Sequence, residues 1–184
     1  MAKFLAGVAV TALVLAGTAI ALIFSGIYNV AAVQSLHPGL AWILRTTMEN
    51  SVHRQATSIV PPQDFATRAA EGFQDFDDMC VQCHGAPGRE RSEIGEGLAP
   101  QPPNLQNAAQ AWTPSEVFWI VKNGVHMTGM PAFGPTHDDQ RLWAIVAFVK
   151  SLPGMTAERY NQLGGRFPPG GQRGPSGHPG HDHQ

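Results

Sequence analysis

The stretch Cys80-Val81-Gln82-Cys83-His84 contains both cysteines of the 184-residue chain, and a histidine directly follows the second one. Two cysteines at this spacing do not make the disulfide framework of a small secreted fold. Before the motif, apolar side chains recur at helical spacing over residues 64–81, and after it residues 85–103 are rich in glycine and proline. The motif is therefore predicted to lie where a helix ends and a long loop begins.

Three kinds of site use two cysteines at this spacing. A thioredoxin-like dithiol needs a strand before the motif and a helix after it, which is the reverse of this pattern. A structural zinc site needs two further ligands at matching spacing, and the chain has no other cysteine. The remaining site is covalent attachment of haem, because two thiols one helical turn apart can add to the two vinyl groups of one macrocycle. The motif thus predicts one haem c, bound through Cys80 and Cys83, with His84 beneath the iron as proximal ligand.

A haem iron that only transfers electrons usually has a sixth ligand, and four side chains are candidates. These are Met127, Met130, His126 and His137. Met130 is favoured, because the glycine before it lets the backbone approach the haem and the proline after it stiffens the loop. The alternative for Met130 is a methionine that merely fills the core.

The amino terminus is long and apolar. Residues 4–33 contain no side chain that is charged at pH 7. About 20 apolar residues cross a hydrocarbon core about 30 Å thick, and residues 4–24 meet that length. A cleaved signal peptide would have a shorter apolar core and a small-residue cleavage site, for which Ala31-Ala32 is the nearest candidate. We therefore expect residues 1–33 to form an uncleaved transmembrane anchor.

Residues 34–62 form a less apolar segment that is predicted to be a juxtamembrane helix and linker. Its apolar and small side chains recur at helical spacing at Leu40, Ile43, Leu44, Thr47 and Met48. A helix that lies on the membrane or docks on the next domain is favoured over one that binds a specific partner. Two prolines at positions 61 and 62 end the segment.

Residues 63–160 are predicted to form a compact all-α domain with three main helices and no strand. The first helix covers residues 64–81. The second begins at Thr113, where Thr113 and Glu116 make a capping box around a proline, and it ends before Gly124. The third opens at residues 136–139, where two carboxylates complement the helix dipole, and the Pro153-Gly154 pair ends it. Long loops are unusual in so small a domain, unless they enclose a prosthetic group.

The carboxyl-terminal residues 161–184 are rich in glycine and proline and are predicted to be disordered. Three histidines in this tail, His178, His181 and His183, could bind a transition metal weakly. A solvated tail without a metal is the favoured interpretation.

Residues 64–152 resemble a class I cytochrome c domain. Gly72 and Phe76 lie eight and four residues before Cys80, where the family has a glycine and an aromatic residue in its first helix. The resemblance implies that this glycine lets the first and last helices cross closely, here against Ala147-Phe148. It also implies three main helices and loops wrapped around one haem, preceded in this chain by the transmembrane helix.

Two loops carry the rest of the resemblance. Residues 102–105 resemble the family's proline loop, in which a proline carbonyl accepts a hydrogen bond from the proximal imidazole, and this implies Pro103, with Pro102 as the alternative. Residues 129–134 resemble the loop that supplies the distal methionine. The interval from His84 to Met130 is short for the family, which implies a trimmed middle loop and a more exposed haem edge.

The resemblance implies a function in single-electron transfer between membrane respiratory components, by Fe(II)/Fe(III) cycling with His/Met ligation. The expected partners are redox proteins of a respiratory chain, such as a quinol–cytochrome c reductase or a terminal oxidase. The expected location is the bacterial inner membrane with the haem domain on the periplasmic side, because haem is attached in this way outside the cytoplasm. The net charge of −2 and the lack of any basic run exclude nucleic acid as a partner.

Three alternatives stay open at this point. The chain could be a fixed haem subunit of a larger dehydrogenase or oxidase complex. It could be an enzyme with an open distal position, in which His126 would act on a small ligand. A haem-based sensor is the third, but the sequence contains no output domain.

Overall fold

The computed structural model describes residues 1–34 and 36–166, and it divides into two compact units. The first unit, Met1–His37, contains α1 (Ala2–Ser25), a helix of 24 residues. At 1.5 Å per residue this helix is about 36 Å long, enough to cross a bilayer. It is a candidate membrane span by length and composition.

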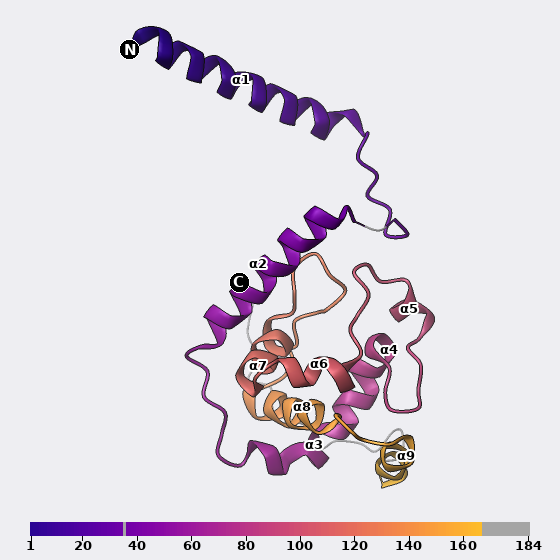
Figure 1. Cartoon of the computed structure of the whole chain (residues 1–184). Coiled ribbons are helices and arrows are strands. Elements are labelled where there is room, and N and C mark those ends of the chain that lie inside the picture. Colours follow the sequence, from indigo (N-terminus) through magenta and orange to yellow (C-terminus); the bar gives the residue numbers. More distant parts are fainter. Residues whose placement is uncertain (35, 167–184) are drawn as a thin grey trace, which may run out of the picture. The chain divides into compact units, whose positions relative to one another are not determined.

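The second unit begins at Pro38 and is helical, as the sequence predicts (Figure 1). No β-strand occurs in the described ranges, where one isolated bridge joins Ala86 to Arg89. Its elements are α2 (Pro38–Ala56), η1 (Phe65–Arg68), α3 (Ala69–Asp75), η2 (Phe76–Cys80), α4 (Val81–His84), α5 (Glu93–Glu96), α6 (Leu105–Ala111), α7 (Pro114–Asn123), α8 (Asp139–Ser151) and α9 (Ala157–Arg166).

Helix α8 is the centre of this unit. It lies between α3 on one side and α6 and α7 on the other (Figure 1). Every residue from 142 to 149 is buried, so α8 has no polar face over two turns. Trp143 stacks on Phe118 of α7 with ring centroids 4.3 Å apart, and Phe148 packs on Phe76 of η2 at 5.0 Å. The core is therefore a set of helices packed around one buried helix.

The crossing of α3 and α8 depends on Gly72. A Cβ atom at this position would lie 2.0 Å from the backbone oxygen of Ala144. The prediction that this glycine packs against Ala147-Phe148 is therefore wrong, since the two backbones meet one helical turn earlier. Phe148 instead contacts the rings of Phe73 and Phe76.

The first helix of the domain is longer and less regular in the structure than the sequence predicts. A helical path continues from Phe65 to His84 through η1, α3, one π-helical turn (η2) and α4. Helices α6 and α9 have no counterpart among the three predicted helices. Composition predicted disorder from residue 161, but α9 continues to Arg166 because Tyr160 and Leu163 pack into the core. The three tail histidines lie outside the described residues.

The predicted start of α7 is confirmed. Thr113 Oγ1 accepts from the Glu116 N–H at 3.3 Å, and Glu116 Oε2 accepts from the Thr113 N–H at 2.7 Å. The helix ends at Gly124, as predicted, with φ 66°. Its ψ of −170° lies outside the left-handed helical region, because the chain leaves in an extended direction toward the next loop.

Candidate functional site

The cysteine motif lies at the last turn of the first helical path. Cys80 ends η2, Cys83 and His84 belong to α4, and Gly85 follows with φ 69°. A Cβ atom on Gly85 would lie 2.8 Å from the Arg89 carbonyl oxygen. The chain can therefore turn back immediately after His84, as a glycine permits.

The His84 imidazole is held by one backbone carbonyl. Its Nδ1 lies 2.9 Å from the Pro103 oxygen, and a carbonyl only accepts, so Nδ1 carries the proton and donates. This fixes the tautomer and leaves the Nε2 lone pair for a metal. Burial lowers the pKa of His84, the hydrogen bond to Pro103 opposes this, and the charge of Arg91 adds to the lowering. The ring is thereby kept neutral, the form in which histidine binds metals.

Both thiols are free of disulfide bonds. Burial raises the pKa of Cys80 to about 12, with smaller contributions from Asp75 and Cys83. A redox dithiol needs a thiolate, hence a lowered pKa. The Cys80 environment favours a thiol that is used for attachment over one that exchanges disulfides.

The loop after the motif folds back onto it. Ser92 donates twice to the Gln82 carbonyl, from its backbone N–H at 2.9 Å and from its hydroxyl at 2.8 Å. A Cβ atom on Gly95 of α5 would lie 2.6 Å from that same oxygen and 3.0 Å from Cys83 Cα. Helix α5 therefore packs directly on the backbone between the two cysteines.

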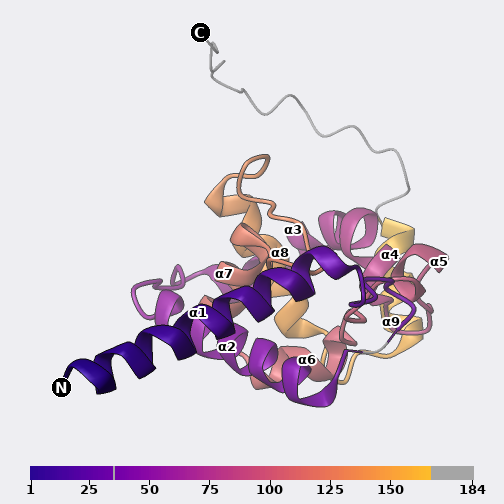
Figure 2. The same cartoon turned by 90° about the horizontal axis from the view of Figure 1, so that it is seen from above.

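A second loop, residues 124–138, leaves the end of α7 and projects beyond the helices (Figure 2). Its base is tied to α7 by the N–H of Phe133, which donates to Val121 at 3.1 Å, and by Gly134, which donates to Lys122 at 2.9 Å. Gly124 is required here, because a Cβ atom would lie 2.8 Å from the Met130 carbonyl oxygen. The loop is thus held in a fixed return path.

The four candidate distal ligands differ in how deeply the structure buries them. Met130 is half-buried and packs against the core, and its N–H donates to Thr128 Oγ1 at 3.1 Å. Met127 has φ 61° and is 91% exposed, and His126 is exposed as well. His137 is half-buried at the start of α8, where its ring meets Phe133 edge-on at 5.6 Å. Met130 is the methionine of this loop that the fold directs inward.

The two loops meet. A Cβ atom on Gly129 of the second loop would lie 2.6 Å from the Leu98 side chain of the first loop. The residue before Met130 therefore lies against the end of the Leu98 side chain, which comes from the loop that follows Cys83 and His84. Two thiols and one oriented imidazole at the end of the first helical path, with one thioether in the second loop, fit a covalently bound haem.

The sequence comparisons agree with this geometry. The family described as "Cytochrome C oxidase, cbb3-type, subunit III" matches residues 67–149. No curated protein and no solved structure matches the chain.

This domain is a c-type cytochrome. A cytochrome c domain implies haem-based electron transfer, which indicates an electron carrier or a subunit of an oxidase. The matched region of the cytochrome includes the cysteine motif and both loops. Helices α1, α2 and α9 lie outside it.

The cytochrome domain also contains two polar contacts that could not be predicted from the sequence. Arg141 of α8 binds the buried carboxylate of Asp75 with two hydrogen bonds of 2.9 and 2.7 Å. Asp77 accepts from Arg89 at 2.5 Å and from the Tyr160 hydroxyl at 2.7 Å. Partners 12 to 83 residues apart in sequence leave no local signal, so a pattern could not have found them.

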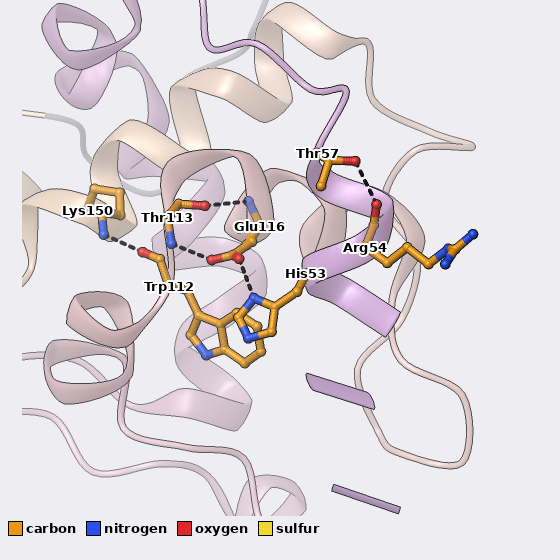
Figure 3. Close-up of polar contacts among 7 residues, drawn as sticks. All are labelled: His53, Arg54, Thr57, Trp112, Thr113, Glu116 and Lys150. Carbon is orange, nitrogen blue, oxygen red and sulfur yellow. Dashed lines mark hydrogen bonds and ion pairs between the residues drawn. The ribbon is translucent and has the colours of Figure 1, made fainter. Parts of the chain in front are cut away.

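A third polar cluster joins α2 to α7 (Figure 3). His53 Nδ1 lies 2.5 Å from Glu116 Oε1, and the His53 ring lies beside the Trp112 ring with centroids 5.3 Å apart. The Glu116 carboxylate that closes the capping box of α7 thus also binds α2. Next to it, Lys150 donates to the Trp112 carbonyl at 2.7 Å.

Proposed function

We propose that this cytochrome binds one haem c by thioether bonds to Cys80 and Cys83, with His84 and Met130 as the axial ligands. It transfers single electrons between components of a membrane respiratory chain. The observation that carries the proposal is the hydrogen bond from His84 Nδ1 to the Pro103 carbonyl, at the end of the cysteine motif. A carbonyl that orients an imidazole through its far nitrogen is the usual support of a metal-binding histidine.

Bound haem supplies a one-electron Fe(II)/Fe(III) couple. The chain's residues set the conditions for it. Pro103 holds the proximal imidazole in one tautomer and orientation, and the contact between Leu98 and Gly129 keeps the distal loop close to the first loop. A thioether from Met130 favours the reduced state and raises the potential relative to a second histidine.

The proposed location is the periplasmic side of the bacterial inner membrane, with α1 as the anchor. Two features support it: α1 is long and apolar enough to span, and covalent haem attachment takes place outside the cytoplasm. The proposed partners are membrane-bound redox proteins, such as a quinol–cytochrome c reductase or a terminal oxidase. An anchored domain stays in a thin layer beside the membrane, which raises its effective concentration near such partners.

Replacement of the two methionines of the distal loop tests the ligand assignment. We expect Met130→Ala to remove the weak red absorption band that sulfur ligation gives ferric haem. It should also lower the midpoint potential by on the order of 0.1 V, within the roughly 0.8 V range set by axial ligands. Met127→Ala is the matched control and should change neither, since Met127 is 91% exposed. An unchanged spectrum in Met130→Ala would favour an open distal site, as in an enzyme that acts on a small ligand.

The family description favours a second candidate, a fixed haem subunit of an oxidase. Gentle detergent extraction followed by native sizing distinguishes the two functions. A shuttle should run as a haem-bearing species of one 19.7 kDa chain plus detergent. Co-migration of all the haem with a much larger complex would contradict the shuttle and support the subunit.

A further inference from the structure

Helix α2 is fixed to the cytochrome domain through its second half. Val52 and Ala56 are buried against the domain, and His53 binds Glu116 (Figure 3). Just after the helix, the Ile59 carbonyl accepts from the Ser115 hydroxyl at 2.8 Å. These contacts hold the carboxyl-terminal end of α2 against the start of α7.

The first half of α2 presents a different face to solvent. Leu40, Ile43 and Leu44 lie at i, i+3 and i+4, so they form one stripe, and they are 38%, 52% and 50% exposed. At 3.6 residues per turn this stripe is turned about 120° from the side on which Val52 is buried. Nothing in the described part of the cytochrome domain covers it. The helix thus carries two apolar faces, of which the domain uses one.

The sequence around the stripe is free of charge. Between Lys3 and Arg45 there is no Asp, Glu, Lys or Arg. The first charged side chain, Arg45, is paired with Glu49 on the same helix at 2.8 Å. The segment that leads into α2 also exposes large apolar side chains, at Ile27, Tyr28, Val30, Val33 and Leu36.

The chain length limits where the stripe can lie. The twelve residues between Ser25 and Pro38 reach at most roughly 40 Å when fully extended. If α1 spans the membrane, the start of α2 must therefore lie within about 40 Å of the bilayer surface. Three partly exposed side chains are also far fewer than the 20–30 residues, or about 800 Å² per partner, of a stable protein interface.

We propose that the stripe of Leu40, Ile43 and Leu44 lies in the lipid headgroup region of the membrane that α1 spans. This inference rests on the proposed membrane anchoring. One face of α2 then contacts lipid while the other is bonded to the cytochrome domain. The haem domain is held at a fixed height and orientation, so a partner reaches it by diffusing sideways in the membrane. A cytochrome swinging on a free tether would not be restricted in this way.

Site-directed nitroxide labels on the full-length ferric holoprotein test the proposal, with the protein reconstituted in vesicles of phosphatidylcholine and phosphatidylglycerol. Three variants each carry one added thiol: Leu13→Cys in α1, Ile43→Cys in the stripe and Asn50→Cys seven residues further along the same face of α2. Collision rates with oxygen, which concentrates in lipid, and with a water-soluble nickel complex give the depth of each label.

We expect the oxygen-to-nickel collision ratio at position 43 to exceed that at position 50 several-fold. A label at position 43 that is as open to nickel as position 50, while position 13 lies in lipid, would overturn the inference and leave the anchor intact. Exclusion of both reagents at position 43 would also overturn it, in favour of a protein partner or a second copy. A water-exposed label at position 13 would reject the anchor, and the inference with it.

Discussion

Gly72 lies where α3 crosses α8, and its missing side chain lets the two backbones touch. A Cβ atom there would lie 2.0 Å from a backbone oxygen and 2.4 Å from a backbone carbon of Ala144. A backbone atom of a buried helix cannot rotate away as a flexible side chain can. This one residue thus determines how closely α3 and α8 approach each other.

We expect Gly72→Ala to destabilise the holoprotein by about 3 kcal/mol or more, the upper end of the range for overpacked cores. The measurement is thermal or denaturant unfolding, followed by haem absorbance and circular dichroism. Gly165→Ala is the control, since a Cβ atom there meets nothing within 4 Å and α9 gains a better helix former. Equal stability of the two variants would show that α3 can shift away from α8 at little cost.

Glu116 acts at the scale of elements, because one carboxylate serves two helices. One oxygen caps α7 through the Thr113 N–H, and the other accepts from His53 of α2. Burial alone would raise the pKa of Glu116, but the hydrogen bonds of Thr113 and His53 outweigh it and lower the pKa below its usual 4.5. Folding therefore stabilises the ionised form of Glu116.

We expect wild-type stability to include a contribution from Glu116 that is complete above about pH 4.5 and is lost as the pH falls through the lowered pKa of Glu116. Glu116→Gln should cost about 1–2 kcal/mol at neutral pH and should flatten this part of the pH profile. The measurement is unfolding free energy against pH, with hydrogen exchange over residues 38–56 to detect release of α2.

Glu71→Gln is the matched control, since it removes an exposed carboxylate from another helix of the domain. It should leave the exchange of α2 unchanged. If Glu116→Gln protected α2 as well as the wild type does, the charge of Glu116 would not be what holds this helix.

At the scale of the whole molecule, the haem domain is acidic. Residues 64–160 contain seven Lys and Arg against twelve Asp and Glu, a difference of −5. Such a field attracts cations and basic protein surfaces over a Debye length, about 30 Å at 0.01 M salt and about 8 Å at 0.15 M. Partners with a basic docking face should therefore associate faster than acidic ones.

Two small redox reagents of opposite charge test this field on the intact cytochrome. Raising the ionic strength from about 0.01 to 0.2 M should slow reduction by the hexaammineruthenium(II) cation several-fold and accelerate oxidation by ferricyanide. Stopped-flow haem absorbance gives both rates. A salt dependence of the same sign for both reagents would mean that charge near the haem does not control the encounter.

The sequence by itself determined the features that depend on neighbours in the chain. The contiguous motif of Cys80, Cys83 and His84 indicated the haem, and the capping box of Thr113 and Glu116 located the start of α7. Helical spacing and turn residues gave the all-α class and the apolar α1. These signals extend over one or two helical turns, so they survive in a one-dimensional pattern.

Only the tertiary structure decided the contacts between distant parts of the chain. It paired Gly72 with Ala144, chose Pro103 over Pro102 for His84, and turned Met130 inward while Met127 points to solvent. It also showed that α2 uses Val52 for docking, while no described residue of the domain covers its more obvious apolar stripe. The physical reason is that helical spacing marks an apolar face, but the packing of the other helices decides what that face meets.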